Sequence, residues 1–240
     1  MRSDHRPYPI KRFFGYIERS YINRLLAPQA DQFGDHSMVL KPWHVRLHGK
    51  CIRIGAAPHI IAAADRPVSL TTWSYEAHQG EIDIGDYVLI CPGVRIDSAV
   101  SVRIGANCML AANSYITDAD WHDQYDRTQP VGVSAAVELG NNVWIGDGAM
   151  VCKGVSIGAN AIVGARALVN RDVPANAIVA GNPARVVKML DPQRPIRTRA
   201  DLLRDPRALQ TQLRDLDRYM LNPNGWWNWL RTLFAPNQSD

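Results

Sequence analysis

The sequence contains few of the features that mark metal, redox or membrane-spanning proteins. Only four of its 240 residues are cysteines, and no two of them form a CxxC pair: Cys51, Cys91, Cys108 and Cys152. Neither a zinc motif nor a redox motif is therefore indicated. No stretch approaches the roughly 18–20 apolar residues that cross a bilayer, and the first residues lack the apolar segment of a secretory signal. We expect a cytoplasmic protein with reduced thiols.

The excess of positive over negative charge is also small. The net charge is +4 at pH 7, and 21% of the residues are charged. Because nucleic-acid-binding domains carry clustered basic residues, we expect no nucleic-acid partner. A glycine-rich phosphate loop is absent as well, which excludes a nucleotidyltransferase domain. Apolar residues make up 46% of the chain, enough for one folded core with extensions.

What the sequence does contain is a six-residue repeat. An aliphatic residue, followed each time by a small or short one, recurs at Leu139, Ile145, Val151, Ile157, Val163 and Val169. Two earlier triplets start at Ile84 and Ile104. A period of six fits neither an α-helix nor a two-faced strand. It indicates one short strand and one turn per six residues, and three such units close a triangular coil. We therefore predict an all-β fold, a parallel β-helix, rather than a β-sandwich.

The ends of the chain differ from this repeat. Apolar residues that recur three and four positions apart predict helices near residues 8–27 and 199–221. The expected organisation is an N-terminal extension with a short helix (1–50), the column (51–190) and a C-terminal helical extension (191–240). The last part includes Trp226, Trp227 and Trp229. This tail either touches a membrane on its cytoplasmic face or packs on a neighbouring subunit or coil.

The hexads stop after Ile116 and resume at Leu139, which predicts a polar inserted loop over residues 117–136. This loop contains His122, the only histidine after residue 80. An unperturbed imidazole titrates near neutral pH, so His122 is a candidate general base. A carboxylate could orient its ring, and Asp118, Asp120 and Asp123 are all candidates.

Two phrases resemble the hexapeptide-repeat acyltransferases, especially the galactoside and maltose acetyltransferases among the sugar O-acetyltransferases. They are Val143-Trp144-Ile145-Gly146 and Ala180-Gly181-Asn182-Pro183-Ala184-Arg185, and the resemblance covers about residues 80–190. It implies a left-handed β-helix, a homotrimer, and transfer of an acetyl or other acyl group from acyl-CoA. The implied acceptor is a sugar hydroxyl or amine, in surface polysaccharide biosynthesis.

The resemblance also assigns roles to residues. It implies that His122 is catalytic and that coenzyme A lies in a groove between two subunits. Beside His122 we expect Asp120 and Asp118 to take part in catalysis as partners of its ring. The residues implied for that groove are Trp144, Ala165, Asn170, Arg185 and Lys188. Acceptor-binding candidates are Cys91, Asn113 and Asp123. Cys91 stands where we align an asparagine of the family, which puts the acceptor's identity in doubt, and no metal is implied.

Two other functions remain open on the same fold. One is a binding or structural solenoid that has lost its chemistry, because fold alone does not determine function. The other is a γ-carbonic-anhydrase-like metal hydratase, which needs three converging histidines. Only His122 lies in the interrupted region, so this second alternative is weaker.

Overall fold

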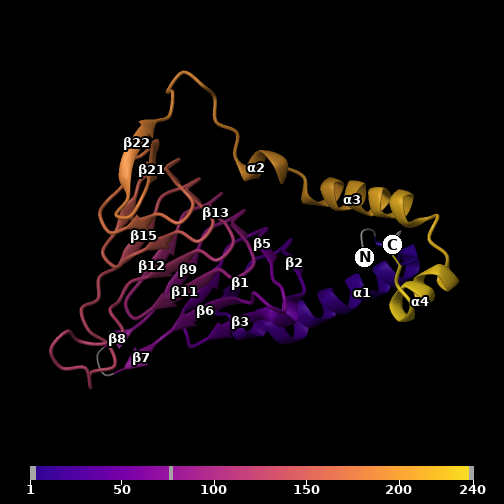
Figure 1. Ribbon diagram of the computed structural model, residues 1–240, viewed down its shortest axis with the longest axis horizontal. Helices are drawn as coiled ribbons and strands as arrows, with labels where there is room; N and C mark the ends of the chain where they lie inside the picture. The colour runs from indigo at the N-terminus through magenta and orange to yellow at the C-terminus, as the bar shows by residue number, and fades with distance from the viewer. Residues whose placement is uncertain (1–3, 76–77, 238–240) are drawn as a thin grey trace.

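The computed structural model describes residues 4–75 and 78–237. It is a three-sided column of stacked β coils, with helices from both ends of the chain packed together beyond one end of the column (Figure 1). Among the described residues, no helix combines the length and apolar character needed to cross a membrane.

Three sheets form the sides of the column, and successive strands of a coil belong to sheets A, B and C in turn. Sheet A contains β1 (Gln32–Phe33), β4 (Ile52–Ile54), β9 (Ile82–Ile84), β12 (Val102–Ile104), β15 (Val137–Leu139) and β18 (Ser156–Ile157). Sheet B contains β2 (Met38–Leu40), β5 (His59–Ile61), β10 (Leu89–Ile90), β13 (Met109–Leu110), β16 (Trp144–Ile145), β19 (Ile162–Val163), β21 (Ala177–Ala180) and β22 (Arg185–Met189). Sheet C contains β3 (Val45–His48), β6 (Val68–Thr72), β11 (Arg95–Ser98), β14 (Tyr115–Thr117), β17 (Met150–Val151) and β20 (Leu168–Val169). A separate hairpin joins β7 (Ser74–Tyr75) to β8 (His78–Gln79).

The repeated aliphatic residues build the core by stacking in register. Ile104 pairs with Leu139, which pairs with Ile157, and all three are buried. The small residue that follows each one allows the next coil to approach. A Cβ added to Gly146 would lie 2.6 Å from the backbone nitrogen of Ala165, closer than real Cβ contacts allow. The six-residue pattern thus encodes both the core and the tight corners.

The column starts earlier than the expected boundary at residue 51. β1 already pairs in parallel with β4, and β2 with β5, so residues 32–48 form a first coil. At the other end, β22 runs antiparallel to β21. Most turns of the first coil lack the aliphatic residue followed by a small one, so the six-residue repeat did not reveal this coil.

Helices at both ends qualify the all-β description. α1 (Tyr8–Tyr21) continues into the short helices η1 (Ile22–Leu26) and η2 (Ala27–Gln29), and η3 (Pro42–His44) precedes β3. The C-terminal part contains α2 (Arg199–Leu202), α3 (Pro206–Leu221) and α4 (Trp226–Phe234). The helices expected near residues 8–27 and 199–221 are therefore present, and the chain combines a β column with helical ends.

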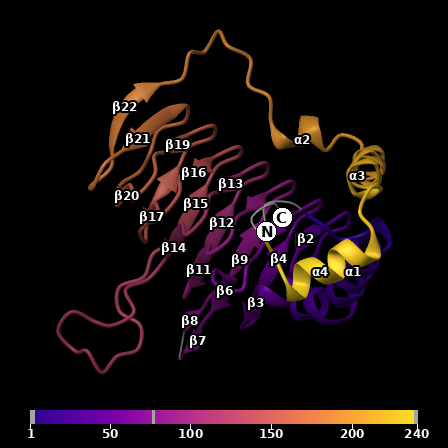
Figure 2. The ribbon, with the colours of Figure 1, turned by 45° about the vertical axis from the view of Figure 1, so that its right-hand side comes forward.

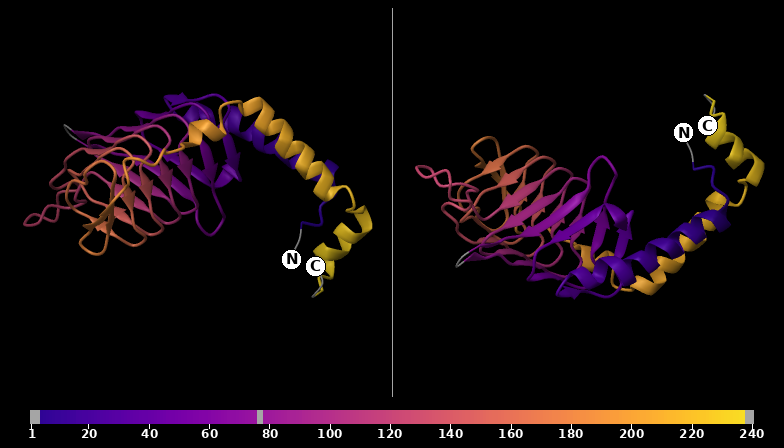
Figure 3. Two further views of the ribbon diagram at one scale, coloured as in Figure 1. Left: turned by 90° about the horizontal axis from the view of Figure 1, so that it is seen from above. Right: turned by 90° about the horizontal axis from the view of Figure 1, so that it is seen from below.

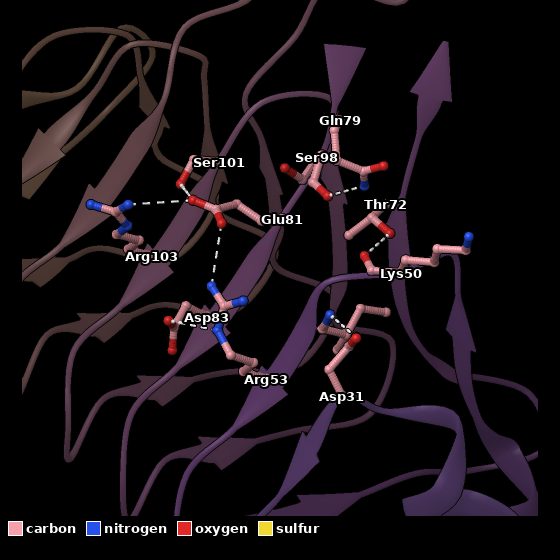
Figure 4. A network of polar contacts seen from close by, with 12 residues as sticks. Asp31, Lys50, Arg53, Thr72, Gln79, Glu81, Asp83, Ser98, Ser101 and Arg103 are labelled. Atoms are coloured by element: carbon pink, nitrogen blue, oxygen red, sulfur yellow. Dashed lines mark hydrogen bonds and ion pairs between the residues drawn. The ribbon is translucent and has the colours of Figure 1, made fainter. Parts of the chain in front are cut away.

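The outer faces of sheets A and B differ in chemistry. On sheet A the outward row is charged, with Arg53, Asp83, Arg103 and Glu138 in register. Arg53 lies 3.2 Å from both Asp83 and Glu81, and Figure 4 shows these pairs. On sheet B the corresponding row is mostly apolar: Met38, His59, Leu89, Met109, Trp144, Ile162 and Ile178. The charged outer row of sheet A therefore suits contact with water, whereas the apolar outer row of sheet B suits contact with another apolar surface or ligand.

Candidate active site

The loop that carries His122 leaves the column where sheet C turns into sheet A. It follows β14 and precedes β15, and it projects beside the β7–β8 hairpin (Figures 1 and 2). Its base is closed by backbone hydrogen bonds, among them Asp120 N–H to Val133 O at 2.9 Å and Gly132 N–H to Asp120 O at 2.8 Å. Gly132 has no room for a side chain, because a Cβ there would lie 2.4 Å from the carbonyl oxygen of His122. The loop is thus an excursion whose two ends are hydrogen-bonded to each other at its base.

His122 is exposed, and its ring is oriented by the loop itself. Nδ1 lies 3.2 Å from the carbonyl oxygen of Gln129. A carbonyl can only accept, so this contact requires the proton on Nδ1. The lone pair is then on Nε2, which can accept a proton from a substrate. A general base held in one tautomer by a backbone carbonyl is a common arrangement for histidine.

Asp118 does not orient His122. Its carboxylate is fully buried and accepts four hydrogen bonds from the corner of the coil below. The donors are Ser98 Oγ (2.7 Å), Ala99 N–H (2.7 Å), Val100 N–H (2.9 Å) and Ser101 N–H (2.6 Å). The predicted catalytic role for this residue is therefore not supported by its contacts, since its buried carboxylate bonds to the coil below and not to His122. Asp118 fixes the point from which the loop departs.

Asp120 and Asp123 are also committed elsewhere. Asp120 Oδ1 lies 2.7 Å from Nζ of Lys153, in the turn after β17, so this pair ties the loop to the next coil. Asp123 Oδ1 accepts the N–H groups of Tyr125 and Asp126, both at 2.9 Å, and these bonds hold the pKa of Asp123 below its usual value. Among the hydrogen bonds of the described residues, none joins His122 to the carboxylate of Asp118, Asp120 or Asp123.

Sequence reasoning missed an aromatic and charged cluster at the base of the loop. Trp121 Nε1 donates to the hydroxyl of Tyr115 at 3.1 Å, and the Trp121 and Trp73 ring centroids are 5.6 Å apart. The Arg95 guanidinium lies 3.8 Å from the centroid of the Tyr115 ring and pairs with Asp97 at 2.8 Å. Burial raises the pKa of Asp97, against the opposing charge of Arg95. The twenty-residue spacing from Arg95 to Tyr115, which are in register, was the available signal.

The residues expected to bind coenzyme A lie mainly on sheet B, away from the loop. Trp144, Ile162, Ile178 and Lys188 follow one another in register. Trp144 is 45% exposed, and Arg185 and Lys188 are exposed on β22. Neither of these two cations forms an ion pair with another described residue. Their row combines an aromatic ring with free positive charge.

The remaining candidates lie at corners of the column. Cys91, Asn113 and Ala165 lie in turns that join sheet B to sheet C, whereas Asn170 follows β20 at the corner that also carries the loop. Burial raises the pKa of the Cys91 thiol, and the nearby Arg199 acts in the opposite direction. Asn113 has φ +58°, so it makes the left-handed turn of its corner.

The loop and sheet B therefore point in different directions within one chain. In a triangular column, the corner between sheets C and A is the one opposite the face of sheet B. His122 cannot reach Trp144 or Lys188 of its own chain without crossing the column. A site that combines them needs a second copy of the chain.

In the part of the chain that the structure describes, no group of three His, Cys, Asp or Glu side chains could hold a metal ion. A surface depression of about 330 Å³ lies over sheet A and is lined by Asp83, Arg103 and Glu138, among others. It contains none of the residues that the sequence nominated.

Two families of repeats match the column on either side of the loop. The family described as bacterial transferase hexapeptide (six repeats) matches residues 136–171, and the hexapeptide repeat of succinyl-transferase matches residues 82–118. The intervening residues, which include His122, lie outside both matches.

Curated relatives show the same relationship. Nodulation protein L of Rhizobium meliloti is 36% identical over an alignment of 139 residues, and the match covers 49% of this chain and 76% of that protein. Galactoside O-acetyltransferase of Escherichia coli is 31% identical over 119 residues, 49% of this chain and 58% of that enzyme. For two further relatives the chain covers 62% and 61% of their length. The chain thus spans less than two thirds of the length of several relatives that it matches.

A solved structure has the same fold. A variant of AntD, an N-acyltransferase from Bacillus cereus in complex with dTDP-4-amino-4,6-dideoxyglucose and coenzyme A, superposes with a TM-score of 0.58. It is 19% identical, and the match covers 79% of this chain and 96% of that one. At this identity the likeness concerns the architecture alone.

Proposed function

The chain belongs to the hexapeptide-repeat acyltransferase family, and from this premise we propose that it transfers an acetyl group from acetyl-CoA to a sugar hydroxyl or amine. The sugar acceptor is supported by the name of one relative, galactoside O-acetyltransferase. Family membership also favours a left-handed column and a role in surface polysaccharide biosynthesis. A different acyl group would use the same chemistry.

One observation carries the proposal: the loop with His122 and the row with Trp144 lie on opposite sides of one column. A closed ring of three copies can bring the loop of one subunit to sheet B of the next. The apolar outer row of sheet B is suited to such contact, whereas the charged row of sheet A is not. Each trimer would then have three equivalent sites, each built from two chains.

In this site His122 acts as the general base. Nε2 accepts the proton of the acceptor hydroxyl or amine while that oxygen or nitrogen forms its bond to the acyl carbon. The proton then passes from Nε2 to the departing sulfur. The carbonyl of Gln129 accepts the Nδ1–H hydrogen bond throughout and so holds the ring in place.

Coenzyme A would supply the activated thioester, and the exposed residues of sheet B fit such a molecule. Arg185 and Lys188 are free to pair with phosphate oxygens. Trp144 offers an exposed ring beside the expected path of the pantetheine arm. Ala165 leaves space at the neighbouring corner. Asn170 lies instead at the corner that carries the loop, so it would belong to the half of the site that the other chain contributes.

Removal of the imidazole tests the proposal. His122→Ala should lower kcat by about 10²- to 10⁴-fold, the usual contribution of a general base, and leave the mass of the assembly in light scattering unchanged. Tyr125→Ala is the matched control, because Tyr125 lies in the same loop and is 97% exposed. Unchanged turnover by His122→Ala, with acetyl-CoA and a panel of free and nucleotide sugars, would contradict the assignment.

A further inference from the structure

Three helices, α1, α3 and α4, form a helical arm that extends away from the column (Figure 3). Lys11 of α1 pairs with Asp217 of α3 at 2.5 Å. Asn224, between α3 and α4, donates to the backbone oxygens of Asp4 (2.7 Å) and Arg6 (3.0 Å). The two ends of the chain are thus joined into one unit.

The arm exposes an unusual amount of apolar surface. Its exposed apolar side chains are Phe13, Phe14, Tyr16, Ile17, Leu213, Leu216, Tyr219, Met220, Trp226, Trp227, Leu230, Leu233 and Phe234. Several are almost wholly in solvent, with Trp227 at 86% and Phe234 at 85%. Single exposed apolar residues are normal on proteins, but a set of this size on one unit marks an interaction surface.

The orientation of α1 shows that this exposure is built into the packing. Lys11 and Glu18 are seven residues apart and therefore lie on one side of the helix. Both make contacts inward: Lys11 with Asp217, and Glu18 with the N–H of Lys41 at 3.1 Å. Phe13 and Ile17 lie on the other side. α1 thus uses Lys11 and Glu18 for contacts with the rest of the protein, while Phe13 and Ile17 stay exposed on its other side.

The arm also carries all of the protein's net charge. α1, α3 and α4 contain seven Lys and Arg residues and three Asp and Glu residues, which gives +4. The whole chain is also +4, so the remainder is neutral overall. Positive charge and exposed aromatic rings therefore coincide on the same unit.

We infer that the helical arm lies flat on an anionic lipid surface. Trp and Tyr side chains favour the boundary between headgroups and acyl chains, and cationic side chains between them favour anionic headgroups. Contact between arms of several copies would instead bring like charges of +4 together. The inference is independent of the acyl-transfer chemistry, because the arm contains none of the residues proposed for catalysis.

Vesicle co-sedimentation of the full chain tests the inference. The protein should bind vesicles made of equal parts phosphatidylcholine and phosphatidylglycerol at least tenfold more tightly than phosphatidylcholine alone. Raising the salt to about 1 M, where the Debye length falls to roughly 3 Å, should remove most of that preference. Equal binding to both vesicles, or none, would overturn the inference.

Two variants separate the apolar and electrostatic contributions. Trp227→Ser/Phe234→Ser should weaken binding at least tenfold, and Arg12→Glu/Arg19→Glu should abolish the preference for anionic vesicles. Tyr125→Ser removes an equally exposed ring outside the arm and should change nothing. Far-UV circular dichroism checks that the helices persist. If the variants instead alter the mass of the assembly and leave vesicle binding intact, the face joins copies of the chain and the inference fails.

Discussion

Subunit complementation gives the sharpest test of a site shared between two chains. One variant, His122→Ala, lacks the base but keeps sheet B. The other, Arg185→Glu/Lys188→Glu, keeps the base but places two negative charges where phosphates are expected. Both changes are at exposed positions, so neither should disturb folding. Each homotrimer is expected to be nearly inactive.

The expected recovery follows from the arrangement of the column. Each site takes its loop from one chain and sheet B from the next, so a site is intact only if the loop comes from the charge-reversal variant and the sheet from His122→Ala. After random exchange of equal amounts, about a quarter of the sites satisfy this condition in a cyclic trimer. Two unit charges 4 Å apart in water interact by about 1 kcal/mol. Each reversal replaces an attraction of this size by an equal repulsion, so the two reversals together cost about 4 kcal/mol. That is about a thousandfold in affinity for coenzyme A.

The assay is release of free thiol from acetyl-CoA, measured before and after the two variants are unfolded together and refolded. Activity near a quarter of the parent supports the shared site. A mixture as inactive as its components, with trimers shown by mass spectrometry to contain both chains, would refute the reasoning. In that case the loop and sheet B would not meet across subunits.

Two further predictions concern the corner beneath the loop. Asp118→Ala should lower the free energy of unfolding in urea by about 3 kcal/mol, because buried donors at residues 98–101 lose their acceptor. Asp120→Ala, whose partner Lys153 is partly exposed, should cost at most about 1 kcal/mol, and equal costs would contradict the distinction. Burial raises the folded-state pKa of Asp97, so the stability that this group contributes is present below its unfolded pKa of about 3.9 and is lost as pH rises through the raised pKa. From about pH 4 upward, the free energy of unfolding of Asp97→Asn should therefore rise relative to that of the parent. A difference between the two proteins that does not change with pH would contradict this prediction.

The fold was largely predictable because its core is encoded locally. Each aliphatic residue and the small residue after it specify one inward side chain and one corner, as Ile145 and Gly146 do. The first coil escaped this reasoning because its corners use other means, such as the positive φ of His36 and Lys41. The parallel pairing of β1 with β4 is therefore seen in the structure and not in the six-residue pattern.

The candidate site was predictable only in part. The break in the repeat located the loop and singled out His122 by composition. The three aspartates of that loop, however, look alike in sequence. Asp118 points into the coil below, Asp120 reaches Lys153 in the coil above, and Asp123 closes a turn. Trp73 and Trp121, 48 residues apart, meet only because the hairpin and the loop leave the same corner.

The amino-acid sequence by itself determined that this chain winds into a column and that one excursion carries an imidazole. Both follow from neighbours within six residues, whose spacing leaves a single way to bury the aliphatic side chains. The tertiary structure decided which groups surround that imidazole, on which corner it stands, and which side of α1 faces outward. These depend on contacts between residues one coil or almost a whole chain apart, such as Lys11 with Asp217, and no local pattern encodes them.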